Sequence, residues 1–125
     1  MILDHIGIPV SDYAAAKQFF AQALAPLNIS LVLEVKGWAG FGRAGRPQFW
    51  FGQGESGAVA APQHIAFAAE NRAQVRAFYE AALQAGAKDN GAPGIREIYH
   101  PHYYGAFVIG PDGYNVEAVC HLPTE

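Results

Sequence analysis

Hydrophobic and polar positions alternate along the start of the chain, which predicts a β-strand. In residues 3–10 this alternation places His5 on a face of small side chains. Apolar residues then recur at helical spacing as far as about Leu24, behind a helix cap at Ser11 or Asp12. Short runs separated by glycine and proline predict three further strands, at residues 29–35, 37–43 and 48–52.

The same order of elements recurs in the second half of the chain. Residues 63–69 alternate as the first strand does and place His64 among alanines, 59 residues after His5. At that offset residues 17–24 align with residues 76–83 and keep Phe, Ala and Leu in register. The rest of this half predicts a helix, a loop and three strands, at residues 71–85, 88–94, 95–99, 103–109 and 114–120. The chain therefore contains an internal repeat.

This order predicts an α+β fold in which two helices cover one face of a curved sheet. Residues 1–125 form a single domain, with halves at 1–55 and 62–125 and a Gly-, Ala- and Ser-rich linker at 52–62. The histidine faces carry little bulk, so they suit a cavity on the open side of the sheet. Another strand packed closely against these small residues is the alternative.

Composition narrows the class of protein. The formal net charge is −3, and the eight Lys and Arg residues are scattered, so neither nucleic acid nor an anionic membrane is an expected partner. The first residues include Asp4 and His5 where a signal peptide would need basic residues and an apolar run. Cys120 is the only cysteine and cannot form an internal disulfide. We therefore expect a cytoplasmic protein with a small-molecule substrate.

Three residues of this pattern suit metal binding. Glu117 lies in a strand otherwise suited to burial, where a carboxylate needs a partner or a cation. His5 and His64, on equivalent strands, could join it to bind Fe, Mn, Ni or Zn and leave positions open for substrate. Two simpler interpretations stay open: the histidines are structural, or Glu117 pairs with Arg43 or Arg96.

These residues resemble a known family, the vicinal oxygen chelate superfamily of glyoxalases, extradiol dioxygenases, fosfomycin-resistance enzymes and bleomycin-binding proteins. The similar segments are Leu3-Asp4-His5-Ile6-Gly7, residues 19–24, His64-Ile65-Ala66-Phe67 and residues 110–117. The resemblance implies paired βαβββ modules that form a U-shaped sheet, and a divalent metal held by His5, His64 and Glu117. It also implies a homodimer, in which His5 of one chain can meet His64 and Glu117 of the other.

One position departs from the family's pattern. Aligning the last strand of each half places Trp50 where the first module would supply its own ligand, and an indole N–H only donates. A true glyoxalase is therefore disfavoured, and the remaining two histidines and one carboxylate are more similar to the dioxygenase ligand set. The dioxygenase signature is itself incomplete at Phe107 and Gly110.

The densest group of polar aromatic residues lies at 100–104. His102, His100 and Tyr104 are candidates for proton transfer, and Trp50 and Tyr103 are candidates for substrate binding. If Tyr104 faces the cavity, alternation places Ala106 and Val108 on the same face. An aromatic loop packed over a sheet edge or a second subunit is the alternative.

Two functions follow from these residues. The first is a metal-dependent lyase, isomerase or dioxygenase whose cation chelates two substrate oxygens. The second is a metal-free resistance protein that sequesters an aromatic or cationic compound.

Overall fold

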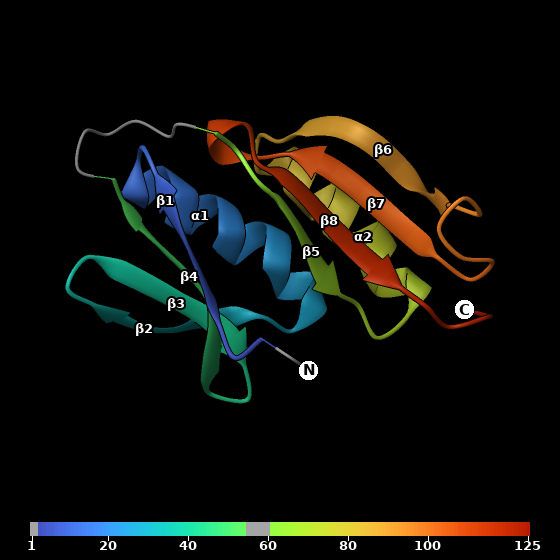
Figure 1. The fold of residues 1–125 in the computed structure, drawn as a ribbon, viewed down its shortest axis with the longest axis horizontal. Coiled ribbons are helices and arrows are strands. Elements are labelled where there is room, and N and C mark those ends of the chain that lie inside the picture. Colours follow the sequence, from blue (N-terminus) through green and yellow to red (C-terminus); the bar gives the residue numbers. More distant parts are fainter. Residues whose placement is uncertain (1–2, 55–60) are drawn as a thin grey trace.

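The structure is a computed structural model that describes residues 3–54 and 61–125, and it contains two βαβββ halves (Figure 1). The first half consists of β1 (Ile6–Val10), α1 (Tyr13–Leu24), the short 3-10 helix η1 (Ala25–Leu27), β2 (Ser30–Val35), β3 (Trp38–Arg43) and β4 (Arg46–Gln53). The second half consists of β5 (His64–Ala68), α2 (Arg72–Gln84), β6 (Lys88–Ile95), β7 (Tyr104–Ile109), the 3-10 helix η2 (Pro111–Gly113) and β8 (Asn115–Cys120).

Each half folds into its own four-stranded sheet. The strand orders are β1-β4-β3-β2 and β5-β8-β7-β6, with β1 parallel to β4 and β5 parallel to β8. Within residues 3–54 and 61–125 no hydrogen-bonded ladder joins the two sheets, so β1 and β5 are both edge strands. The predicted α+β fold with two βαβββ modules is confirmed.

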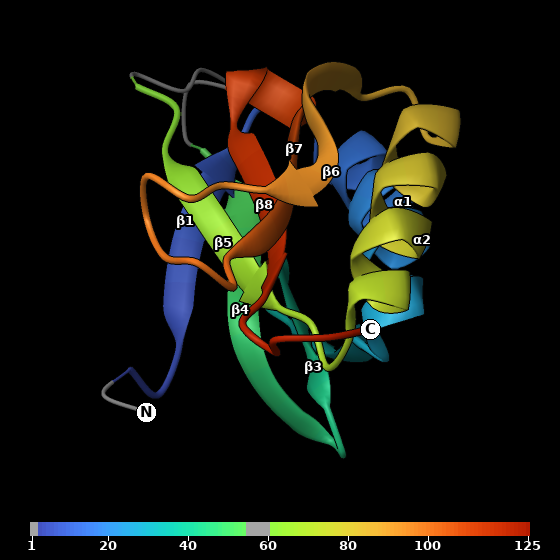
Figure 2. The same cartoon turned by 90° about the vertical axis from the view of Figure 1, so that its right-hand side faces the viewer.

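The two helices pack against each other on one side of the molecule, as the turned view makes plain (Figure 2). Asp12 caps α1 through the backbone N–H of Ala15 at 3.0 Å, and Asn71 caps α2 through Gln74 N–H at 2.8 Å. Side-chain oxygens at these positions accept from N–H groups that the first helical turn leaves free. No helix among the described residues is long and apolar enough to cross a membrane.

Aromatic side chains form the core between helices and sheets. Phe20 of α1 packs edge-to-face on Phe49 of β4 with ring centroids 4.9 Å apart. Phe49 in turn meets Phe67 of β5 at 5.1 Å, which carries the core from the first half into the second. Such pairs add to the free energy gained by burying their area.

Two hydrogen bonds tie the second half to the end of β1. The hydroxyl of the fully buried Tyr114 donates to the Pro9 carbonyl at 2.6 Å. The Ser11 N–H donates to Asp112 Oδ2 at 3.0 Å. The turn before β8 therefore fixes β1 relative to the second module.

Three predicted boundaries are wrong. Residues 88–94 form strand β6 rather than a loop, and residues 95–99 lead into a turn rather than a strand. Glycine and proline are tolerated in β6 because it is an edge strand with register shifts on both sides of Gly91. The expected linker at 52–62 begins later, since β4 runs to Gln53, and residues 55–60 lie outside the described part.

Candidate functional site

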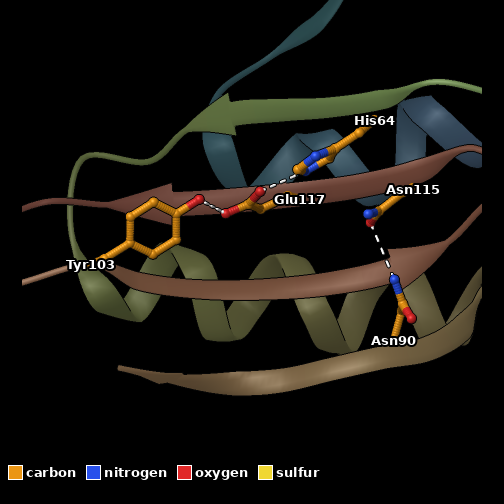
Figure 3. A network of polar contacts seen from close by, with 5 residues as sticks. All are labelled: His64, Asn90, Tyr103, Asn115 and Glu117. Carbon is orange, nitrogen blue, oxygen red and sulfur yellow. Dashed lines mark hydrogen bonds and ion pairs between the residues drawn. The ribbon is translucent and has the colours of Figure 1, made fainter. Parts of the chain in front are cut away.

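Glu117 is a fully buried carboxylate in the middle of β8. It is the only charged or polar residue found buried among those the structure describes. Its Oε1 lies 2.7 Å from His64 Nε2, and its Oε2 accepts a hydrogen bond from the Tyr103 hydroxyl (Figure 3). A buried carboxylate without such partners would be strongly unfavourable.

A glycine makes room for this arrangement. A Cβ atom at Gly105 would lie 3.1 Å from Glu117 Oε2 and 3.1 Å from the Tyr103 ring. Burial, followed by the hydrogen bond to Glu117, raises the pKa of Tyr103 above its usual range. Tyr103 therefore remains a neutral donor at physiological pH and holds one carboxylate oxygen in place.

His64 reaches Glu117 from the neighbouring strand. In the parallel ladder His64 lies opposite Asn115, and Ala66 lies opposite Glu117, so the small alanine leaves room for the His64 ring to reach the carboxylate. The His64 side chain is 51% exposed, and its ring lies 6.1 Å from that of Phe107. In this pair a half-exposed histidine contacts a fully buried carboxyl group, so the site can be reached from solvent on the histidine side.

His5 does not join this pair within one chain. Its side chain is 61% exposed, and its Nδ1 lies 2.8 Å from Asp4 Oδ1, a contact that lowers the pKa of Asp4. In residues 3–54 and 61–125 no three His, Cys, Asp or Glu side chains converge as a metal site requires. The structure thus brings together two of the three predicted ligands, His64 and Glu117.

The first module has a tryptophan where the second has its carboxylate. Trp50 pairs with Gly7 in the β1–β4 ladder, as Glu117 pairs with Ala66 in the β5–β8 ladder. Trp50 lines a groove of about 850 Å³ together with Trp38 and His5. This position agrees with the predicted role of Trp50 in shaping a pocket, and that role stays a prediction.

Glycines let both indoles lie against the sheet. A Cβ at Gly40 would come within 2.8 Å of the Trp50 ring, and one at Gly52 within 2.6 Å of the Trp38 ring. The indoles occupy the volume that side chains at these positions would fill. The groove therefore has an aromatic floor.

Tyr104, a predicted candidate for proton transfer, does not lie beside Glu117. Its ring lies on the helix side, 5.0 Å from the Arg72 guanidinium carbon, and its hydroxyl accepts from Arg76 Nη1 at 3.3 Å. Tyr104 shares a face of β7 with Ala106 and Val108, as the alternation predicts, but this face packs against the helices, and both smaller residues are fully buried. Tyr103 takes the cavity-side position instead.

His100 and His102 form a separate exposed group. Their rings lie 5.5 Å apart, and His100 lies 5.7 Å from His121, whose ring is 5.3 Å from that of Tyr103. Tyr103, which contacts His121 and donates to Glu117, links this group to the carboxylate. Their proposed role in proton transfer stays a prediction.

The alternative arginine partners of Glu117 are engaged elsewhere. Arg43 donates to the carbonyls of Leu27 and Ala68, and Arg96 donates to that of Ala92. Sequence reasoning missed the Tyr103–Glu117 hydrogen bond. The sequence signal that could have indicated it is Gly105. This glycine lies two residues after Tyr103, on the same face, and leaves space for the tyrosine ring beside β8.

Comparison with known proteins places this geometry in a family. A sequence profile of the glyoxalase/bleomycin resistance protein/dioxygenase superfamily matches residues 2–118. The chain belongs to this superfamily. No curated protein matches it significantly.

Solved structures of this superfamily have the same fold. A glyoxalase/bleomycin resistance protein from Albidiferax ferrireducens is 23% identical over 98% of this chain and 100% of its own, with a TM-score of 0.83. A glyoxalase/bleomycin resistance protein/dioxygenase family enzyme from Burkholderia phytofirmans is 17% identical over 95% and 98%, with a TM-score of 0.74. A glyoxalase-related enzyme from Fulvimarina pelagi is 16% identical over 96% and 87%, with a TM-score of 0.69.

Proposed function

We propose that this chain is a metal-dependent enzyme of the glyoxalase/bleomycin resistance protein/dioxygenase superfamily, with His64 and Glu117 as metal ligands. The observation that carries the proposal is the environment of Glu117. Its carboxylate is fully buried, and among the described residues its hydrogen-bond partners are a half-exposed histidine and a tyrosine, with no lysine or arginine. Buried carboxylates are paired with charges or coordinate metals.

The geometry of the pair fits a divalent cation. Two ligands at neighbouring corners of an octahedron, each about 2.1 Å from the metal, lie about 3.0 Å apart. His64 Nε2 and Glu117 Oε1 lie 2.7 Å apart, so a small side-chain rotation accommodates the ion. Fe, Mn, Ni and Zn all accept an imidazole nitrogen and a carboxylate oxygen.

Two ligands do not complete such a site, and we propose that His5 of a second copy supplies the third. The contact of His5 Nδ1 with Asp4 leaves Nε2 free to ligate, an arrangement in which a carboxylate orients a metal-binding imidazole. Among the described residues, β1 and β5 each have a ladder partner on one edge alone, so two copies could align their other edges. The proposed assembly is a homodimer with a site at each junction.

The chain's own residues would then divide the work. The bound cation would polarise two neighbouring substrate oxygens and stabilise negative charge on them. Tyr103 keeps Glu117 oriented through Oε2 and leaves Oε1 for the metal side. Trp50 supplies a flat apolar wall against which a planar part of the substrate can stack.

A complementation experiment tests both the ligands and the shared site. His5→Ala and Glu117→Gln chains, each unable to hold metal alone, are combined as a purified mixed pair. If sites are shared, one junction of that pair unites intact His5 with intact His64 and Glu117. We expect one tight metal per mixed pair by calorimetry and none in either parent. Absence of metal from the mixed pair would contradict the shared site.

The aromatic floor of the first-module groove favours a second candidate function. Trp38 and Trp50 could hold a planar compound without any metal, as in a resistance protein that sequesters its ligand. Quenching of tryptophan fluorescence by planar compounds, measured with and without chelator, separates the two functions. Binding that survives chelation supports sequestration, whereas binding lost with the metal supports the enzyme.

A further inference from the structure

Arg96 lines a hollow in the second module that is separate from the groove lined by Trp50. The hollow measures about 380 Å³ and is lined by Arg96, Asn90 and Asn115 together with Phe107, Tyr99 and Ile98. Its lining thus combines polar and apolar side chains. The predicted metal ligands do not line this hollow, and it is distinct from the groove lined by Trp50 and Trp38.

The guanidinium of Arg96 is held in place by its surroundings. Its Nη2 donates to the Ala92 carbonyl at 2.7 Å, and its carbon atom lies 5.3 Å from the centre of the Phe107 ring. Cβ atoms at Gly91 and Gly94 would each lie 3.1 Å from its terminal nitrogens. The two glycines therefore leave the space that the guanidinium occupies on β6.

Its positive charge has no carboxylate partner among the residues that the structure describes. The salt bridges found among residues 3–54 and 61–125 do not include Arg96. A guanidinium presents five donors in a planar fork that suits carboxylate and phosphate oxygens. With one nitrogen bound to Ala92, the others remain available to a ligand.

Two amides add polar groups to the hollow. Asn90 Nδ2 donates to Asn115 Oδ1 at 3.3 Å, and this pair lies near Glu117 on the same sheet (Figure 3). Each amide group has two N–H donors, so donors remain for an anion after this contact. Arg96, Asn90 and Asn115 thus provide positive charge and N–H groups in one place.

The hollow is aligned with Glu117 across the sheet. Gly91 of β6 lies opposite Phe107 of β7, and Phe107 lies opposite Glu117 of β8. Neighbouring strands lie about 4.8 Å apart, so Gly91 on β6 and Glu117 on β8 are roughly 10 Å apart. The centre of the Phe107 ring lies 5.3 Å from the Arg96 guanidinium carbon and 6.1 Å from the centre of the His64 ring.

We propose that this hollow binds the anionic end of the substrate, a carboxylate or phosphate, with Arg96 as the residue that selects it. The proposal rests on the proposed function in taking His64 and Glu117 as the reacting centre. The anion binds Arg96, an apolar part packs on Phe107 and Tyr99, and the reacting group extends toward Glu117. The substrate class is a small organic anion.

Benzoate and its neutral isostere benzamide test the selection of charge. Both are titrated into ¹⁵N-labelled protein in the presence of chelator, and the amide signals of Gly91 and Gly94 are followed. We expect benzoate to bind at least about tenfold more tightly than benzamide, since the neutral amide loses the charge-assisted hydrogen bonds. Equal affinity of the two compounds would overturn the proposal.

Two single-residue variants test whether Arg96 is the residue that binds the anion. Arg96→Gln should weaken benzoate binding at least about tenfold and leave benzamide binding unchanged. Lys88→Gln, which removes an exposed charge from the same strand, should change neither. Unchanged benzoate affinity in Arg96→Gln contradicts the proposal. If Arg96→Gln fails to fold, the affinities of the unmodified protein for benzoate and benzamide test the proposal instead.

Inorganic phosphate distinguishes the two kinds of anion. If phosphate displaces benzoate, the hollow accepts phosphate groups as well as carboxylates. If benzoate stays bound, the hollow selects carboxylates. Because chelator is present throughout, these titrations succeed or fail independently of the metal site.

Discussion

Trp50 occupies in the first module the register position that Glu117 occupies in the second. Each lies on the strand parallel to the first strand of its module, opposite a small residue, Gly7 or Ala66. The two modules share a backbone plan but carry different chemistry at the equivalent point. One face offers an aromatic wall, and the other offers a buried carboxylate with a histidine.

Substitution of Glu117 tests the metal ligand directly. Glu117→Gln should weaken divalent metal binding by at least about 100-fold, since loss of even an outer-shell partner costs about 10–100-fold. Isothermal titration calorimetry with Zn, Mn and Ni measures the effect. Glu80→Gln, an exposed change on α2, serves as the control. Equal affinity in Glu117→Gln and the unmodified protein would rule out this ligand.

Tyr103→Phe tests the hydrogen bond that orients Glu117. At pH 7 we expect the free energy of unfolding to fall by about 1–3 kcal/mol, because the carboxylate loses a buried donor. Urea denaturation measures this loss, and Tyr99→Phe, which alters an exposed neighbour, provides the control. A Tyr103→Phe protein as stable as the unmodified one would show that the bond contributes nothing.

The same pair predicts a pH dependence. Burial and the hydrogen bond raise the pKa of Tyr103, whereas tyrosine in an unfolded chain ionises near about 10. Above that pH the unfolded chain loses a proton that the folded chain keeps, so the stability contributed by Tyr103 decreases as pH rises. The difference in unfolding free energy between unmodified protein and Tyr103→Phe should therefore narrow from pH 10 upward. A gap that stays constant to pH 11 would contradict the raised pKa.

Gly40→Ala tests the aromatic floor. The new Cβ would lie 2.8 Å from the Trp50 ring, so the indole must move and its fluorescence emission should shift to longer wavelength. Gly7→Ala is the matched control, because its Cβ would make an ordinary 3.6 Å contact with Trp38. We expect the control to gain about 0.5–1 kcal/mol of stability, as alanine for glycine in a strand does. Identical emission and stability in the two variants would contradict the close packing.

Tyr114→Phe tests the tie between the modules. The loss of its hydroxyl leaves the Pro9 carbonyl without that donor, and we expect a cost of about 1–3 kcal/mol in urea denaturation. Tyr79→Phe removes an exposed hydrogen bond to Asp89 and should cost less than about 1 kcal/mol. Equal losses in the two variants would indicate that the tie has no special importance.

Periodicity along the chain predicted the fold well because the repeat is strong and both helices carry clear caps. The errors lie in the second half, at residues 88–99, where the glycines and Pro93 of β6 resemble a loop. Register shifts let an edge strand carry these residues, and register depends on the partner strand β7. A single segment of sequence does not contain that information.

The candidate site was predictable in part for a related reason. The repeat places His64 and Glu117 on the first and last strands of the second module, which pair in parallel, so both residues could be chosen from sequence. Tyr103 and Tyr104 are adjacent and chemically alike, and only the packing of α2 against β7 decides which one faces Glu117. In the proposed assembly His5 reaches the site from a second chain, and sequence periodicity does not describe contacts between chains.

Anomalous X-ray scattering from crystals grown with Mn or Zn tests the proposed metal centre most directly. We predict a peak within about 2.3 Å of His64 Nε2 and Glu117 Oε1, with His5 of a second copy as the third protein ligand. A map without a peak there, with His64 still in direct contact with Glu117 at saturating metal, would contradict it.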